Sequence, residues 1–258
     1  MGGQIETLIL LAIVALLILL RFDARRFGAA DFDDEAAPGG LRTWTRRLTW
    51  YGFGVVLVFV VYFLFPQPET LLHLRLGEPR GFALLAGLGL AIGGGAAGAA
   101  YAWWRFGGIA LPEARHYPVG ILNSFLTAFI DEAAFRGILL GLLLFFEWPM
   151  DLAIGFQAVL YALATRLGGA GRPRGLLLLS LGIGLVGGWL TVGTGGIGAA
   201  LLGHTLTRFA IFVATGHAGQ VTPSAASEDE LAEEGLLEPM GLEVVADDDF
   251  GAGVRGVE

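Results

Sequence analysis

The stretch that decides the fold of this chain is Ser124-Phe-Leu-Thr-Ala-Phe-Ile-Asp131-Glu132-Ala-Ala-Phe-Arg136-Gly137. It places two acidic residues and one arginine within six positions, inside a run that is otherwise apolar from Val119 to Phe146. That run is long enough to cross a bilayer, which needs ~20 mostly apolar residues. We therefore interpret it as a membrane-spanning helix that carries charges.

These charges are expensive at membrane depth. Near a helix centre each costs roughly 3 kcal/mol on insertion, or about 9 kcal/mol for the three. The sixteen Leu, Ile, Phe and Val residues of the run return roughly 0.3–0.6 kcal/mol each, or about 7 kcal/mol in all. The segment alone is marginal in lipid, so its charges need a cavity lined by protein or water. Charged residues in such a place indicate a functional site.

The composition of the whole chain agrees with a membrane protein. Of its 258 residues 55% are hydrophobic and 16% are charged, and its mean hydropathy is +0.67. A soluble domain has about 25% charged residues. There is no cysteine, which excludes disulfides, a thiol nucleophile and cysteine-based metal sites. All sixteen basic residues are arginine, and with the many Ala and Gly residues this is typical of a GC-rich prokaryotic genome.

The apolar blocks predict an all-α fold, a polytopic bundle of about seven transmembrane helices. Small residues in the third span, Gly93 to Gly98, predict a surface on which another helix packs closely. A tight turn is predicted at Thr194-Gly195-Gly196. The predicted spans are residues 5–20, 48–65, 82–103, 119–146, 151–165, 176–192 and 197–215.

The chain divides into three parts at this level. Residues 1–47 form an N-terminal anchor helix and a cytoplasmic linker, and residues 48–218 form the membrane-embedded bundle. Residues 219–258 form an acidic tail that we expect to be disordered. The net charge of −8 comes from that tail, since residues 223–258 hold eleven acidic residues and one arginine. The charge therefore says little about a substrate.

Arginines are concentrated in alternate loops. The loops after the first, third and fifth spans are predicted to be cytoplasmic, because cytoplasmic loops carry the excess of basic residues. This places the N-terminus outside and the C-terminus inside the cell membrane. The arginines of these loops are Arg21, Arg25, Arg26, Arg42, Arg46 and Arg47, then Arg105 and Arg115, then Arg166, Arg172 and Arg174; the opposite loops hold only Arg75 and Arg80.

Within the charged helix, Glu132 and Arg136 are i,i+4 neighbours and can pair. Asp131 lies about 100° around the helix, so the same arginine does not hold it. One interpretation is a buried ion pair with a second, solvated acid. The other is an acid that activates water while Arg136 fixes its geometry. One helix does not separate these alternatives.

His204 is a second ionisable residue at membrane depth, near the middle of the last span. A lone intramembrane histidine is often a hydrogen-bonding partner between helices. Arg208, one turn later, must find a partner or extend toward the cytoplasmic face. The other histidines, at 73, 116 and 217, lie in loops or at span ends and are interpreted as incidental.

The motifs in residues 119–210 together resemble the CPBP (ABI) intramembrane proteases, whose best-known members are the CAAX prenyl endopeptidases. Asp131-Glu132-Ala-Ala-Phe-Arg136 resembles the EExxxR motif of that family, and Phe156 to Thr165 resembles its FxxxH segment. The glycine-rich segment Gly182 to Ile197 resembles its hairpin, and Leu201-Leu202-Gly203-His204 resembles the approach to its HxxxN motif.

The resemblance implies that a motif acid and a histidine activate water, and that a later His and Asn stabilise the oxyanion. It places Asp131 and Glu132 at the acids and His204 at the last histidine. Three positions depart from the family pattern: Asp131 replaces Glu, Thr165 replaces the second-motif His, and Arg208 replaces Asn. Of these, Thr165 matters most, because a hydroxyl cannot act as a general base near neutral pH. The scheme that survives is water activated by carboxylate and oriented by Thr165.

We predict no metal and no cofactor. A catalytic zinc needs three protein ligands and an open position. Asp131, Glu132 and His204 could nominally supply three, but Thr165 removes the imidazole that the family pattern would add. The predicted partners are membrane lipid and a peptide or protein substrate of unknown identity, with no nucleic acid.

Three functions remain open from the sequence. The first is an intramembrane endopeptidase, with Glu132, Asp131 and His204 as catalytic residues and with Arg136, Thr165 and Arg208 in support. The second is a family member that has lost hydrolysis and acts as a binding or scaffold protein. The third is a small transporter that uses the two acids for proton coupling, although no repeated half-units with broken helices are evident.

Overall fold

The computed structural model describes residues 2–27, 40–65, 67–109, 111–112, 114, 117–167 and 174–215. These residues form helices and connections and contain no strand, which confirms the all-α prediction. They all belong to one compact unit, Met1–Val221. The predicted acidic tail, His116, His217 and the basic loop residue Arg172 lie outside the described residues.

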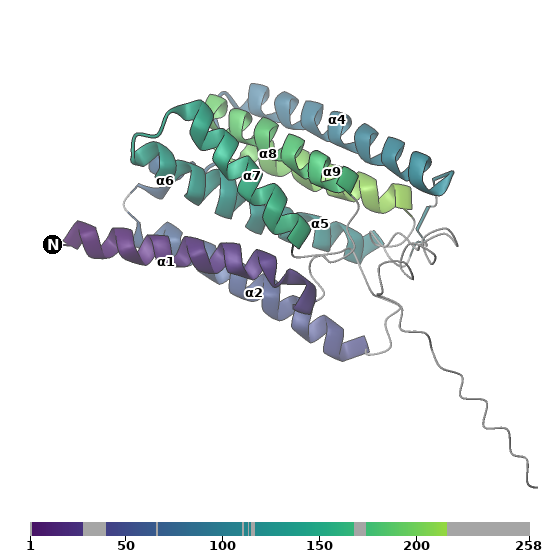
Figure 1. The fold of residues 1–258 in the computed structure, drawn as a ribbon, viewed down its shortest axis with the longest axis horizontal. Helices are drawn as coiled ribbons and strands as arrows, with labels where there is room; N and C mark the ends of the chain where they lie inside the picture. Colours follow the sequence, from purple (N-terminus) through teal and green to yellow (C-terminus); the bar gives the residue numbers. More distant parts are fainter. Residues whose placement is uncertain are drawn as a thin grey trace, which may run out of the picture. The chain divides into compact units, whose positions relative to one another are not determined.

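Each of the seven predicted spans coincides with one long helical segment (Figure 1). The described elements are α1 (Gly2–Phe22), η1 (Ala24–Phe27), α2 (Gly40–Leu64), α3 (Pro68–Leu71), α4 (Arg80–Phe106), α5 (Tyr117–Asp131), η3 (Glu132–Leu139), α6 (Leu140–Phe145), α7 (Met150–Leu167), α8 (Arg174–Thr194) and α9 (Gly198–Thr215).

Three stretches are long and apolar enough to cross a membrane: Thr45–Leu64, Arg80–Trp104 and Leu177–Thr194. Shorter apolar helices of 10–17 residues accompany them. Large apolar side chains cover much of the outside of the bundle; Ile92, for example, is 74% exposed. Such a surface is stable only against lipid or another apolar partner.

The second span begins earlier than predicted. The predicted span starts at residue 48, whereas α2 is one continuous helix from Gly40. Trp50 does not lie at an interface: its ring is fully buried, and its Nε1–H donates to the backbone oxygen of Leu20 at 2.9 Å. The ring packs against α1, and this contact places the first turns of α2 against the bundle.

The sequence predicted one regular α-helix for the charged span, and the structure differs. It consists of α5, a π-helical segment η3 and the short α6 in succession. The π-helical segment begins at Glu132 and contains Arg136. Wide turns of this kind often occur at functional sites. Here the segment carries most of the charges.

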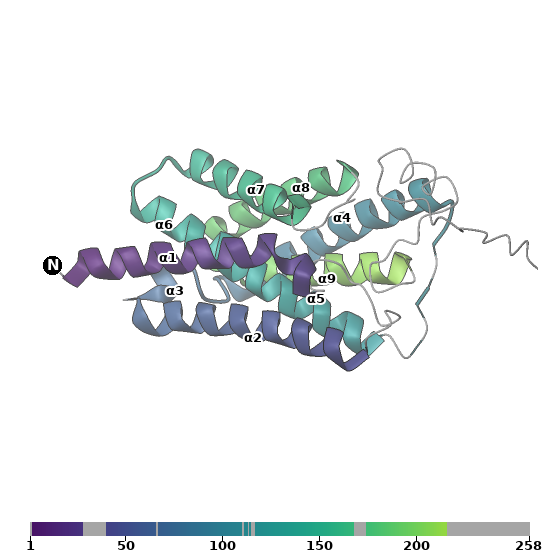
Figure 2. The same ribbon diagram turned by 60° about the horizontal axis from the view of Figure 1, so that its bottom comes forward.

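The predicted small-residue surface is confirmed. Helices α4 and α9 lie side by side along their length (Figures 1 and 2). A Cβ atom at Gly94 would lie 2.3 Å from the Oγ1 of Thr207, and one at Gly98 would lie 2.5 Å from Ile211. Only glycine permits this approach, which brings α9 and therefore His204 close to the rest of the bundle.

The segment between α3 and α4 contacts both α6, which continues the charged span, and the start of α9, which carries His204. On one side, the backbone at Leu71 fills the space where Gly141 of α6 lacks a side chain. On the other side, the backbone oxygen of His73 accepts from Ile197 N–H at 3.1 Å, and Glu78 N–H donates to Thr194 at 2.8 Å. The predicted turn is present there, since α8 ends at Thr194.

Candidate active site

The charged residues predicted from the sequence meet in the interior of the bundle. Asp131 ends α5, Glu132 and Arg136 lie on η3, and His204 lies on α9. All four side chains are at most 1% exposed. The site is therefore closed to solvent in this structure.

Glu132 is held at one of its two oxygens. Its Oε1 lies 3.1 Å from Nη1 of Arg136, the predicted i,i+4 partner, and 2.7 Å from Nδ1 of His204. Its Oε2 makes no hydrogen bond with any of the described residues. The carboxylate is thus fixed in orientation while one oxygen keeps its acceptor capacity.

His204 has a second partner that the sequence analysis did not identify as a site residue. Its Nε2 lies 3.1 Å from the hydroxyl of Tyr161 on α7. An ionised carboxylate only accepts, so Nδ1–H donates to Glu132. With the Arg136 guanidinium already on the same oxygen, a neutral imidazole is favoured, and Tyr161 then donates its O–H to Nε2.

The ring of Tyr161 is locked in place from two sides. The guanidinium carbon of Arg136 lies 4.0 Å from the ring centroid, and the ring of Phe135 meets it edge-on at 5.3 Å. A cation over an aromatic face is attracted by the ring quadrupole. The only sequence signal for this residue was a tyrosine at the position where the family pattern has phenylalanine.

Asp131 is held by a residue from a different part of the chain. Its Oδ1 lies 3.3 Å from Nε of Arg21, which is 2% exposed. The contact has the distance of an ion pair without the geometry of a hydrogen bond. We predicted Arg21 in a cytoplasmic loop, and that was wrong, because α1 extends to Phe22 and turns this arginine inward. The sequence around Arg21, an arginine at the end of an apolar run, gives no sign that its partner is a buried acid.

Two predicted supporting residues, Arg208 and Thr165, also lie in the interior of the bundle. Arg208 is 6% exposed, so it does not extend to the surface, and its charge acts on both Tyr161 and His204. Thr165 is 5% exposed, and its hydroxyl makes no hydrogen bond within the described part of the chain. The role of Thr165 in orienting water stays a prediction.

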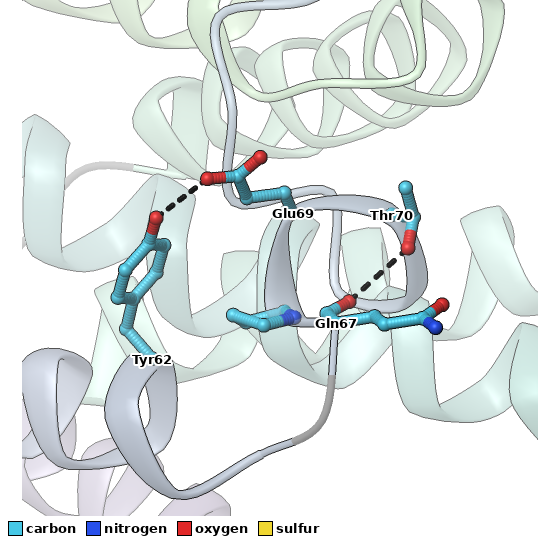
Figure 3. Close-up of a pocket in the computed structure, with 5 residues that line it drawn as sticks. Tyr62, Gln67, Glu69 and Thr70 are labelled. Carbon is cyan, nitrogen blue, oxygen red and sulfur yellow. Dashed lines mark hydrogen bonds between the residues drawn. The ribbon is translucent and has the colours of Figure 1, made fainter.

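A surface pocket lies elsewhere and does not contain these residues. It has a volume of about 310 Å³ and lies where α2 leads into α3 (Figure 3). Tyr62 donates to Glu69 across it at 2.6 Å, and Thr70 donates to the backbone oxygen of Gln67 at 3.2 Å. None of the buried charged residues lines this pocket, so it is not the candidate active site.

The described residues contain no group of three His, Asp or Glu side chains placed to hold a metal ion. The arrangement instead joins an oriented carboxylate, a histidine and a phenol in one chain of hydrogen bonds. A fixed carboxylate with one free oxygen can accept a proton from water.

Residues 113–210 match the protein family described as type II CAAX prenyl endopeptidase, Rce1-like. We refer to this matched region as the Rce1-like domain. The match confirms the resemblance noted from the sequence for this region, and the apolar helices have the length and composition of membrane spans. No curated protein and no solved structure matches the chain. Glu132, Arg136, Tyr161 and His204 lie within the Rce1-like domain, and Arg21 lies outside it.

Proposed function

We propose that this protein is an intramembrane endopeptidase in which Glu132 activates the water that attacks a peptide bond. The observation that carries the proposal is the orientation of Glu132: Oε1 is held by Arg136 and His204, and Oε2 is left free of hydrogen bonds in a buried site. A general base must be positioned before it is useful, and these contacts position it.

In this scheme Glu132 accepts a proton from water through Oε2 as the oxygen attacks the carbonyl carbon. Oε2 then returns the proton to the leaving amine, so that one carboxylate serves as base and acid. Arg136 stays beside Oε1, where its positive charge favours the ionised carboxylate before the attack. The scheme needs neither a metal nor a cofactor.

His204 takes a positioning role in this proposal. The family resemblance implied that it stabilises the oxyanion, but both of its ring nitrogens are engaged, one by Glu132 and one by Tyr161. A histidine held on both sides is suited to orienting the carboxylate, much as a carboxylate orients the histidine of a hydrolytic triad. Asp131, paired with Arg21, has no proton-transfer role in the scheme.

The test is cleavage of an internally quenched peptide with a farnesylated CAAX cysteine by the purified protein in detergent. Glu132→Gln removes the base and keeps the size, so turnover should fall by at least roughly 100-fold, the usual contribution of a positioned general base. Glu147→Gln, an exposed residue of the α6–α7 connection, is the matched control and should keep full activity. Equal turnover in both variants would reject the proposal.

A second function is favoured by the Arg21–Asp131 pair and by Thr165. A member of this family that lacks the motif histidine and has its first acid neutralised would bind substrates or partners without cleaving them. The same assay separates the two functions, because cleavage by the native protein that depends on Glu132 excludes a purely binding role.

We further propose that the protein spans the cell membrane, with its N-terminus outside and its C-terminus in the cytoplasm, and acts on a peptide or protein substrate from within the lipid. The arginine distribution supports this orientation even without the buried Arg21 and Arg47, since Arg25, Arg26 and Arg42 remain in the first loop region. Because the chain has no cysteine, a single cysteine at Glu78 should react with a membrane-impermeant maleimide in intact cells.

A further inference from the structure

Helix α8 turns a glycine toward the free oxygen of Glu132. Gly187 is buried, and a Cβ atom at this position would lie 3.7 Å from Oε2 of Glu132 and 3.4 Å from Nε of Arg136. The third neighbour is Cβ of Ala200 on α9, at 3.5 Å. Glycine at position 187 therefore lets the backbone of α8 lie close to both charged side chains, where a methyl group would be in ordinary van der Waals contact with them and with Ala200.

The two polar atoms close to this position are unsatisfied. Neither Oε2 of Glu132 nor Nε of Arg136 makes a hydrogen bond with the described residues, although both side chains are 0% exposed. Oε2 is a hydrogen-bond acceptor and Nε–H is a donor, so one small polar molecule could bind both. Buried polar groups without protein partners are the sites at which structural waters bind.

Other glycines of α8 have different surroundings. Gly184 and Gly188 face α7, where a Cβ would lie 2.9 Å from Ala158 and 2.7 Å from Gln157, so these two permit close helix packing. Gly182 and Gly193 are exposed, and a Cβ at either would meet no atom within 4 Å. Only at Gly187, among these five, does a Cβ meet charged atoms at ordinary van der Waals distance.

We propose that the space beside Gly187 is the binding site of the attacking water, held between Glu132 Oε2 and Arg136 Nε. This rests on the proposed hydrolytic function and adds a residue to it: Gly187 is a positioning residue that keeps the base accessible to water. A water in this position donates one hydrogen to Oε2 and accepts from Nε–H. Its second lone pair then remains free to attack a carbonyl carbon.

The experiment compares Gly187→Ala with Gly182→Ala and Gly193→Ala on the same helix. All three changes replace glycine by alanine within α8, and so share the same gain in helix propensity. The methyl at 187 fits without a clash but occupies the water site. We expect kcat on the farnesylated CAAX peptide to fall by at least roughly 100-fold with KM and melting temperature unchanged, and only for Gly187→Ala.

A second measurement does not depend on activity. A crystal structure of the native protein at a resolution that shows ordered waters should contain one within hydrogen-bonding distance of both Glu132 Oε2 and Arg136 Nε. The same water should be missing from Gly187→Ala.

A dry site in the native protein, or a water retained in the variant, overturns the inference whatever the activity. Unchanged kcat in Gly187→Ala alongside an inactive Glu132→Gln also overturns it while leaving the proposed function intact. If Glu132→Gln remains active, the proposed function fails, and the ordered water alone then decides whether the site exists.

Discussion

Glu132 and Asp131 are neighbours in the chain, and they are held by different parts of the molecule. Glu132 pairs with Arg136 and His204, both from the Rce1-like domain, and reaches Tyr161 through the histidine. Asp131 pairs with Arg21 of α1, outside that domain. One residue step turns the side chain by about 100° on a helix, which is enough to direct two acids at two sets of partners.

The comparison shows how a closely spaced pair of acids can be divided in role. The Glu132 side combines an ion pair with Arg136, which also lacks hydrogen-bond geometry, with hydrogen bonds through His204 to Tyr161, and it leaves one oxygen free. The Asp131 side is an ion pair without hydrogen-bond geometry, which neutralises the acid and anchors the first helix. In a membrane, the apolar face of α1 packs about as well against lipid as against protein. The ion pair between Arg21 and Asp131 therefore fixes where α1 lies in the bundle.

The largest effect is expected from Arg21→Met, which leaves Asp131 buried without this partner. Removing one member of a buried pair costs roughly 3–5 kcal/mol, so the melting temperature in detergent should fall strongly. Adding Asp131→Asn to the same protein should recover most of the loss, because the unpaired charge is then gone. Arg46→Met, at an exposed position of α2, is the control and should change little.

The double variant also tests the division of roles between the acids. If Asp131 takes no part in the chemistry, Arg21→Met with Asp131→Asn retains peptide cleavage. A double variant that is stable but inactive would show that Asp131 is needed as an acid, and would contradict the comparison.

A smaller effect is expected from Tyr161→Phe, on the Glu132 side. Phenylalanine keeps the ring between Arg136 and Phe135 and removes only the hydroxyl that holds Nε2 of His204. We expect kcat to fall roughly 10- to 100-fold, as is found when a partner that orients a functional histidine is lost. The loss of stability should be about 1 kcal/mol.

Tyr117→Phe on α5 is the control for this change, since its ring packs against Phe209 and Phe212 away from the acids. Equal activity of the two tyrosine variants would mean that the hydroxyl of Tyr161 does not contribute to the site.

The smallest effect is expected at His73, in the connection that ties α6 to the start of α9. Burial lowers the pKa of His73 below its usual value of 6.5, and the nearby charge of Arg75 lowers it further, partly opposed by the backbone of Gly195. The folded protein therefore binds this proton less readily than the unfolded chain does. The stability that depends on neutral His73 is fully present above about pH 6.5 and is lost as the pH falls below it.

The measurement is the melting temperature between pH 7.5 and pH 5, compared with that of His73→Gln. The glutamine variant should lose less stability on acidification than the native protein. An identical pH dependence in both would show that this histidine does not couple proton binding to folding.

The sequence by itself determined the helical class, the seven apolar segments, the glycine surface of the third span and the pairing of Glu132 with Arg136. These follow from hydrophobic length, small-residue spacing and i,i+4 geometry, all of which are local properties of a chain. The motif order also predicted His204 as a site residue, and this residue lies within the matched range 113–210.

Only the tertiary structure decided which partner each acid takes. Arg21 and Asp131 are separated by most of the first half of the chain, and no local pattern joins them. The hydroxyl of Tyr161 reaches His204 because α7 packs against the π-helical segment whose Glu132 also binds His204, and the sequence did not reveal the irregular hydrogen bonding of that segment. The free oxygen of Glu132 and the space beside Gly187 likewise exist only where three helices converge, because an empty volume is a property of packing and not of any one segment.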